Sequence, residues 1–100
     1  MNYAMPDGTV VKTENAIQTW DSYMILDNGQ HVDINTRSVN LRQVLHMTRK
    51  RRYWLEWVYS EEHSRDRAEW LSKEAACRWL LLNDKAIPYD LRELKDEAEE

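Results

Sequence analysis

Residues 41–59 have the sequence LRQVLHMTRKRRYWLEWVY, and this stretch decides the fold. Two largely apolar runs flank a wholly basic segment, Arg49–Arg52, which is typical of two β-strands joined by a charged turn. We therefore predict a hairpin with strands over Leu41–Thr48 and Arg52–Tyr59. Apolar side chains fall on both faces of the later strand, which indicates a position inside the sheet rather than at its edge.

A second hairpin is predicted immediately before the first. Asn28-Gly29 separates Ser22–Asp27 from Gln30–Asn35, and Asn-Gly is the preferred pair for a two-residue turn of type I′. Because a two-residue turn fixes the pairing of its strands, we expect Ile25 to face Val32 on an apolar face.

Shorter elements are predicted on both sides of these hairpins. Asp7-Gly8 is a turn signal, and Thr9–Val11 can begin a short strand. Thr13, followed by an acidic residue, would cap one or two helical turns that reach about Trp20; an irregular extended segment is the alternative. Ala68–Leu71 can add a further strand.

The clearest helix follows Ser72 and ends near Asn83. Ser is a favoured N-cap residue, and an acidic residue in the first turn is stabilised by the helix dipole. Ala76, Trp79 and Leu80 recur at helical spacing, so we expect them to pack on the sheet.

Beyond this helix Pro88 prevents direct continuation, and Asp90 can cap a weak terminal helix. The order of elements predicts an α+β fold: an antiparallel sheet of four to five strands in two hairpins, packed by one main C-terminal helix, with a short N-terminal helix as an option. We expect one domain over residues 1–91 and an acidic, partly frayed tail over residues 92–100.

The composition indicates a folded chain of mixed charge. It has 100 residues, 42% of them hydrophobic, with 14 basic and 18 acidic residues and a net charge of -4. No apolar run is long enough to span a bilayer, and the N-terminus lacks an apolar signal segment, so we expect a cytoplasmic protein without membrane contact. The single cysteine, Cys77, lies in a helical pattern and is expected to be a small buried residue.

Several segments together resemble a known group of proteins. They are residues 7–13, 48–56 and 74–80, with Asn83 and residues 88–91. The most specific part is the Tyr53-Trp-Leu-Glu56 strand followed by the Glu74-Ala-Ala-Cys-Arg-Trp-Leu80 helix. These segments resemble short bacterial and mobile-element proteins with no assigned function, so the resemblance implies architecture rather than activity. That group tends to have Gly in the second turn, where this chain has Arg51, which could strain the turn.

No catalytic, metal or cofactor signature accompanies these elements. His31, His46 and His63 have no pair at the i, i+4 spacing of a helical metal site. There is no nucleophile elbow, and Gly8 and Gly29 are too few and too far apart for a phosphate-cradling loop. We expect no enzyme activity, no metal and no cofactor, with His46 a partly buried ring that makes one hydrogen bond.

The basic turn is the candidate binding site. We expect a small accessory module that meets an acidic patch on a protein partner, for example an inhibitor of a host defence complex encoded on a mobile element. Nucleic-acid binding through the same hairpin is the alternative, although the acidic balance of the chain disfavours it. A homodimer through the edge strand at Thr9–Val11 is also open. The candidate contact residues are Arg49, Lys50, Arg51, Arg52, Arg42, Trp54 and Trp57.

Overall fold

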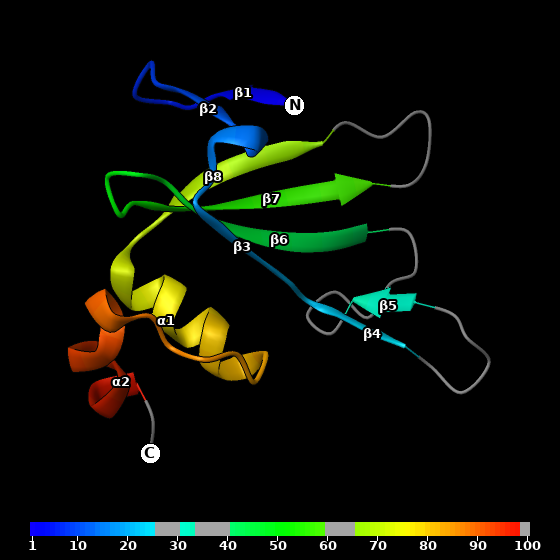
Figure 1. Cartoon of the computed structure of the whole chain (residues 1–100). Coiled ribbons are helices and arrows are strands. Elements are labelled where there is room, and N and C mark those ends of the chain that lie inside the picture. Colours follow the sequence, from blue (N-terminus) through cyan, green and yellow to red (C-terminus); the bar gives the residue numbers. More distant parts are fainter. Residues whose placement is uncertain (26–30, 34–40, 60–65, 99–100) are drawn as a thin grey trace.

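The computed structural model describes residues 1–25, 31–33, 41–59 and 66–98, and its centre is a four-stranded antiparallel sheet (Figure 1). Its strands, in spatial order, are β3 (Gln18–Asp21), β6 (Leu41–Met47), β7 (Tyr53–Tyr59) and β8 (Arg67–Leu71). The α+β class and the interior place of the aromatic strand are confirmed. The described residues hold eight strands in three sheets, however, rather than four to five in one.

The hairpin of β6 and β7 forms as predicted. Its pairing runs from Leu41 opposite Tyr59 to Met47 opposite Tyr53. The Arg51 N–H donates to the Thr48 carbonyl at 3.0 Å and closes the turn. Arg51 has a φ of 61°, the left-handed conformation that glycine adopts most readily, so the turn holds a cationic side chain at a strained position.

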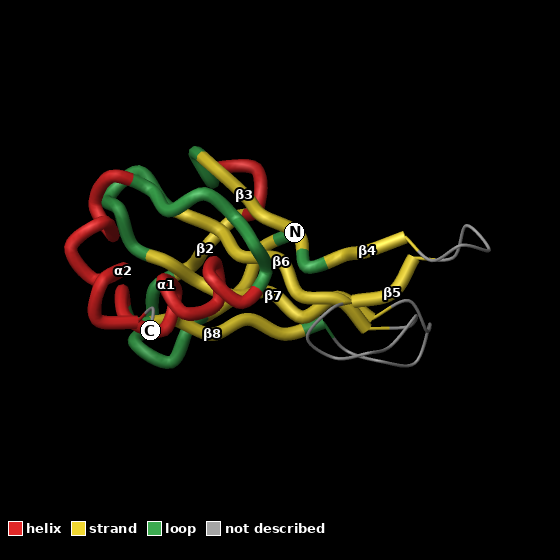
Figure 2. Tube along the Cα trace, turned by 90° about the horizontal axis from the view of Figure 1, so that it is seen from below, coloured by secondary structure: helices red, strands yellow, loops and turns green. Residues whose placement is uncertain are grey.

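The upstream hairpin also exists, but its predicted pairing is wrong by one residue. β4 (Tyr23–Ile25) and β5 (His31–Asp33) pair with Ile25 opposite His31, not opposite Val32. Five residues separate the two strands, an odd number, whereas a two-residue turn requires an even one. Asn28-Gly29 itself lies outside the described residues. The pair forms a sheet of its own and extends away from the main sheet (Figure 2).

At the N-terminus, β1 (Asn2–Ala4) and β2 (Val10–Lys12) form a two-stranded sheet. The strand expected near Thr9–Val11 is therefore confirmed within one residue, but its partner β1 was not predicted. We call this pair the N-terminal hairpin. In Figure 1 it lies on the opposite side of the main sheet from the helices.

Of the two options for the segment from Thr13 to about Trp20, the helix is wrong, and the extended alternative is closer to the structure. Only η1, a 3-10 turn over Thr13–Asn15, is helical, and its N-cap position has no side-chain hydrogen bond. The Ile17 N–H then donates to the Met47 carbonyl at 2.9 Å, and β3 pairs with β6 from there. This pairing buries Trp20 in the core, which outweighs the weak local preference for helix.

The C-terminal part is helical. α1 (Lys73–Leu82) begins as predicted, because the Ser72 hydroxyl accepts a hydrogen bond from the Ala75 N–H at 3.1 Å. η2 (Tyr89–Leu91) and α2 (Arg92–Ala98) follow. Asp90 does not cap α2. It lies within η2, and its Oδ2 accepts a hydrogen bond from the Tyr53 hydroxyl at 2.8 Å.

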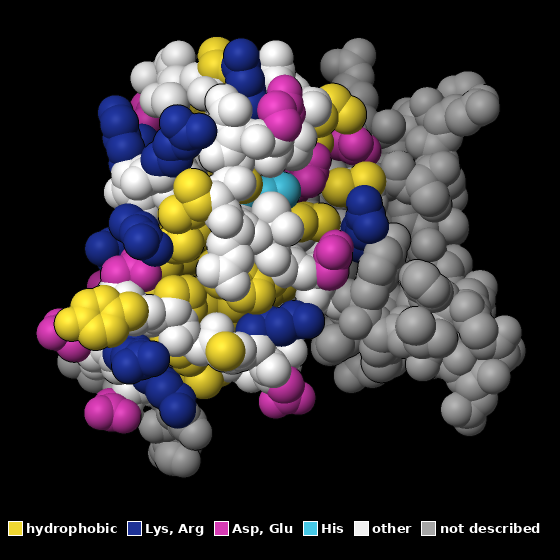
Figure 3. Space-filling view, in the orientation of Figure 1, with side chains coloured by type: hydrophobic (Ala, Val, Ile, Leu, Met, Phe, Trp, Pro, Cys, Tyr) yellow, Lys and Arg dark blue, Asp and Glu magenta, His cyan; other side chains and the backbone are white. Residues whose placement is uncertain are grey.

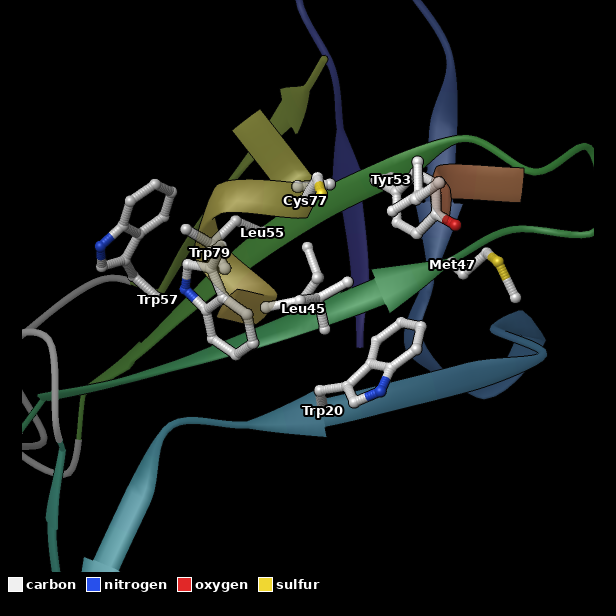
Figure 4. Packing of buried hydrophobic residues seen from close by; sticks show 11 residues of the cluster. Trp20, Leu45, Met47, Tyr53, Leu55, Trp57, Cys77 and Trp79 are labelled. Carbon is white, nitrogen blue, oxygen red and sulfur yellow. The ribbon is translucent and has the colours of Figure 1, made fainter. Parts of the chain in front are cut away.

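Successive side chains of β7 point to opposite faces of the main sheet and belong to two separate buried clusters. Tyr53, Leu55 and Trp57 belong to a helix-side cluster, which also holds buried residues of α1, among them Cys77 (Figure 4). Trp54 belongs to a smaller hairpin-side cluster with Met5 and Val11 of the N-terminal hairpin segment and, more exposed, Tyr3, Ala68 and Trp70. Each face of β7 therefore contributes to a buried cluster.

Replacing Arg51 by Gly should stabilise the fold. Glycine removes the steric cost of the left-handed conformation, and we expect the free energy of unfolding to rise by about 1 kcal/mol. Urea denaturation of Arg51→Gly measures this. Arg49→Gly is the matched control, because Arg49 does not have a positive φ and its replacement should not stabilise. Equal effects of the two changes would contradict the assignment of strain to Arg51.

Candidate functional site

A cleft with a volume of about 310 Å³ lies between β2, η1 and the turn that joins β6 to β7. We call it the cationic cleft. Lys and Arg side chains gather on this side of the molecule, at the left of Figure 3. The lining includes four cations and two aromatic rings: Lys12, Arg49, Lys50, Arg52, Trp54 and Trp70.

The four cations are not equivalent. Arg52 is already engaged: its guanidinium lies 3.7 Å from the centroid of the Trp70 ring and 3.6 Å from the Asp7 carboxylate. Lys12, Arg49 and Lys50 make no ion pair with any carboxylate in the described part of the chain. Arg52 therefore holds the cleft together, and the other three cations are available to an anionic ligand.

Asp7 stays charged at the edge of the cleft. The pKa of this carboxyl is lowered to about 2, chiefly because it accepts hydrogen bonds from Thr9, with a smaller contribution from the Arg52 guanidinium. The Thr9 N–H donates to Asp7 Oδ1 at 3.0 Å. One carboxylate thus offsets one of four cations, and the cleft keeps a positive excess.

The structure brings together four of the predicted contact residues: Arg49, Lys50, Arg52 and Trp54 line the same cleft. Trp54 is only 1% exposed, so it forms the floor rather than a protruding anchor.

The other three predicted residues lie elsewhere. The Arg51 guanidinium contacts the Met47 sulfur at 3.6 Å, on the helix side of the sheet. Arg42 lies toward the far end of β6, 3.9 Å from Asp21. Trp57 is buried in the helix-side cluster, with the Arg67 guanidinium 4.3 Å from its ring centroid. None of the three lines the cationic cleft.

Sequence reasoning missed Lys12 and Trp70 as lining residues. Trp70 lies directly opposite Trp54 across β7 and β8, so the predicted strand at residues 68–71 held a signal for its place. Lys12 had no such signal, because its position depends on how the N-terminal hairpin docks.

A buried polar chain lies on the same face of the sheet as Trp54. His46 Nε2 is 3.0 Å from Glu56 Oε1, and the Tyr3 hydroxyl donates to Glu56 Oε2 at 2.5 Å. The His46 ring stacks on Trp54, with centroids 4.1 Å apart and planes 16° apart. His46 makes one hydrogen bond, as predicted, but it is fully buried at 3% exposed, and its Nδ1 is unpaired among the described residues.

Glu56 carries the charge of this chain of contacts. Burial by itself would raise the pKa of its carboxyl, but the hydrogen bonds from His46 and Tyr3 outweigh burial, and the pKa is lowered. Burial and the same hydrogen bond raise the pKa of the Tyr3 hydroxyl, which therefore remains a donor. Glu56 thus ties β1 to β6 and β7.

The described residues contain no group of three or more His, Cys, Asp or Glu side chains arranged to hold a metal ion. No helix in the described residues is long and apolar enough to cross a membrane. No protein-family model matches the chain, and no match was found among curated proteins or solved structures.

Replacing Glu56 by Gln should make the free energy of unfolding depend less on pH in the acidic range. Because the pKa of Glu56 is lower in the folded than in the unfolded chain, its contribution is complete above the ordinary value of 4.5 and is lost as the pH falls through the folded value. We expect Glu56→Gln to cost about 1–3 kcal/mol at pH 7 and progressively less below pH 4.5.

Urea denaturation of both proteins between pH 3 and pH 7 checks this expectation. Glu93→Gln, an exposed change on α2, is the matched control and should keep the wild-type pH profile. Parallel curves for wild type and Glu56→Gln would show that the Glu56 carboxylate is not stabilised by its partners.

Proposed function

We propose that the protein is a small non-enzymatic binding protein whose cationic cleft takes an acidic segment of a protein partner. The observation that carries the proposal is the convergence of two separate segments of the chain. Lys12 comes from β2, and Arg49 and Lys50 come from the β6–β7 turn, yet all three line one cleft without an acidic partner among the described residues. Such a cluster attracts carboxylates by charge complementarity, which sets specificity and association rate.

The aromatic rings of the cleft favour a protein partner over single-stranded nucleic acid. Bases stack on open ring faces in proteins that bind single strands. Here Trp54 is buried, and one face of Trp70 is covered by Arg52 while the ring packs against the hairpin-side cluster. The chain also carries four more acidic than basic residues, 18 against 14, whereas nucleic-acid-binding domains are usually basic.

An accessory protein encoded on a mobile element is one specific form of this proposal. A protein of this kind acts by occupying a surface of its target in the cytoplasm, for example that of a host defence complex. The acidic surface of the target would meet Arg49 and Lys50 at the tip of the hairpin, where they are exposed.

Reversing the charges of Arg49 and Lys50, two exposed cations of the turn that make no ion pair with a described carboxylate, should weaken binding of an acidic probe. The probe is a fluorescently labelled peptide that alternates Asp or Glu with Val, and binding is followed by its anisotropy at 50 mM salt. We expect Arg49→Glu/Lys50→Glu to weaken binding at least tenfold, and wild-type binding to weaken as salt is raised.

The matched control is Lys73→Glu/Arg78→Glu, which makes the same change in net charge on exposed residues of α1. It should bind as the wild type does. An equal loss in both variants would mean that only net charge matters and would overturn the proposal. Retardation of single- or double-stranded DNA in a gel at 150 mM salt would favour the nucleic-acid alternative instead.

A further inference from the structure

The cationic cleft follows the edge of β2. Four consecutive residues, Thr9 to Lys12, line it. Because successive side chains of a strand point to opposite faces, side chains alone would contribute only alternate residues to a cleft on one face. Because four consecutive residues of this segment line the cleft, the cleft runs beside the backbone of β2.

The hydrogen bonds of the N-terminal hairpin show which backbone groups of β2 point toward β1 and which point away from it. The Met5 N–H donates to the Thr9 carbonyl at 2.8 Å, and the Thr13 N–H donates to the Met1 carbonyl at 3.1 Å. In an antiparallel ladder every second residue directs its N–H and C=O toward the partner strand. Val11 lies midway between Thr9 and Thr13, so its N–H and C=O point toward Tyr3 of β1.

The backbone groups of Val10 and Lys12 consequently point away from β1. Across the described part of the chain, β2 pairs with β1 alone, and the N–H and C=O of Val10 and the N–H of Lys12 take part in no further backbone hydrogen bond. The Lys12 carbonyl is the exception, because Lys12 is the N-cap residue of η1 and its C=O accepts the first hydrogen bond of that turn. The outer edge of β2 thus offers unpaired donors and acceptors next to the cationic side chains of the turn. Unpaired strand edges of this kind are templates for an added strand.

We propose that the outer edge of β2 binds the acidic segment as an added third strand of the N-terminal hairpin. This inference rests on the proposed function, since it specifies how the same cleft takes its ligand. Backbone hydrogen bonds to the N–H and C=O of Val10 and to the N–H of Lys12 align the segment, as in other cases of strand addition. Its carboxylates meet Arg49 and Lys50 on the opposite wall, and its alternate apolar side chains face Trp70.

The positive charge around the outer edge of β2 favours an acidic partner segment over a second copy of this chain as the added strand. If the β2 strands of two copies paired edge to edge, each would bring Lys12 and the cations of its turn toward the same cations of the other copy. Like charges opposed across paired strands are destabilising. An acidic strand makes the same backbone hydrogen bonds and neutralises these cations.

Amide hydrogen exchange of the full chain tests the proposal directly. The probe is the alternating Asp/Glu and Val peptide described above, added to protein labelled with ¹⁵N. We expect exchange at the Val10 and Lys12 amides to slow at least tenfold on binding. The Val11 amide, which already bonds to β1, is the internal control and should change little.

Two N-methylated versions of the peptide give an independent readout. Each is methylated on every second amide, one along each edge of the extended peptide. An added strand bonds through one edge only, so one version should bind at least tenfold more weakly and the other nearly as well as the parent peptide. Equal binding of both, without protection at Val10 and Lys12, would overturn strand addition while leaving the cleft an acidic-segment site.

Other outcomes separate the two proposals further. Absence of binding by the parent peptide, or binding that Arg49→Glu/Lys50→Glu leaves unchanged, would overturn the proposed function together with this inference. Protection of Val10 and Lys12 that appears without peptide as the protein concentration rises would identify a second copy as the occupant and overturn the choice of an acidic partner strand.

Discussion

A buried carboxylate in the middle of β7 is the constraint on which the arrangement of the N-terminal half depends. Glu56 lies between Val44 and Ala68 on the neighbouring strands, where a charge without partners would cost several kcal/mol. Its two oxygens are satisfied by His46 from β6 and Tyr3 from β1. β1 therefore supplies one of the two hydrogen bonds that stabilise this charge in the sheet.

The placement of β1 determines the site. β1 positions β2 through their pairing, and β2 forms one wall of the cationic cleft. The Asp7 carboxylate then pairs with Arg52, which stacks on Trp70 and joins the tip of the N-terminal hairpin to the β6–β7 turn. One buried acid thus organises a surface that favours acidic ligands, although it does not line the cleft itself.

The sequence contained enough information for the elements whose determinants are local. The basic turn between two apolar runs located β6 and β7, and Ser72 located the start of α1. The segment after Thr13 has a helical local pattern, but its residues from Gln18 on pair with residues of β6 that lie 23 to 29 positions later, and that pairing prevailed. Likewise, the sequence showed the cations of the turn but not the cleft. The cleft depends on where β1 and β2 dock, and that docking depends on a contact between Tyr3 and Glu56, which are 53 residues apart.

A double-mutant cycle between Tyr3→Phe and Glu56→Gln tests the central claim most directly. The free energy of unfolding would be measured by urea denaturation at pH 7 for the wild type, the two single variants and the double variant. If the Tyr3–Glu56 contact fastens the N-terminal hairpin, the two changes should couple by about 1.5 kcal/mol or more. Effects that add to within about 0.3 kcal/mol would contradict the account.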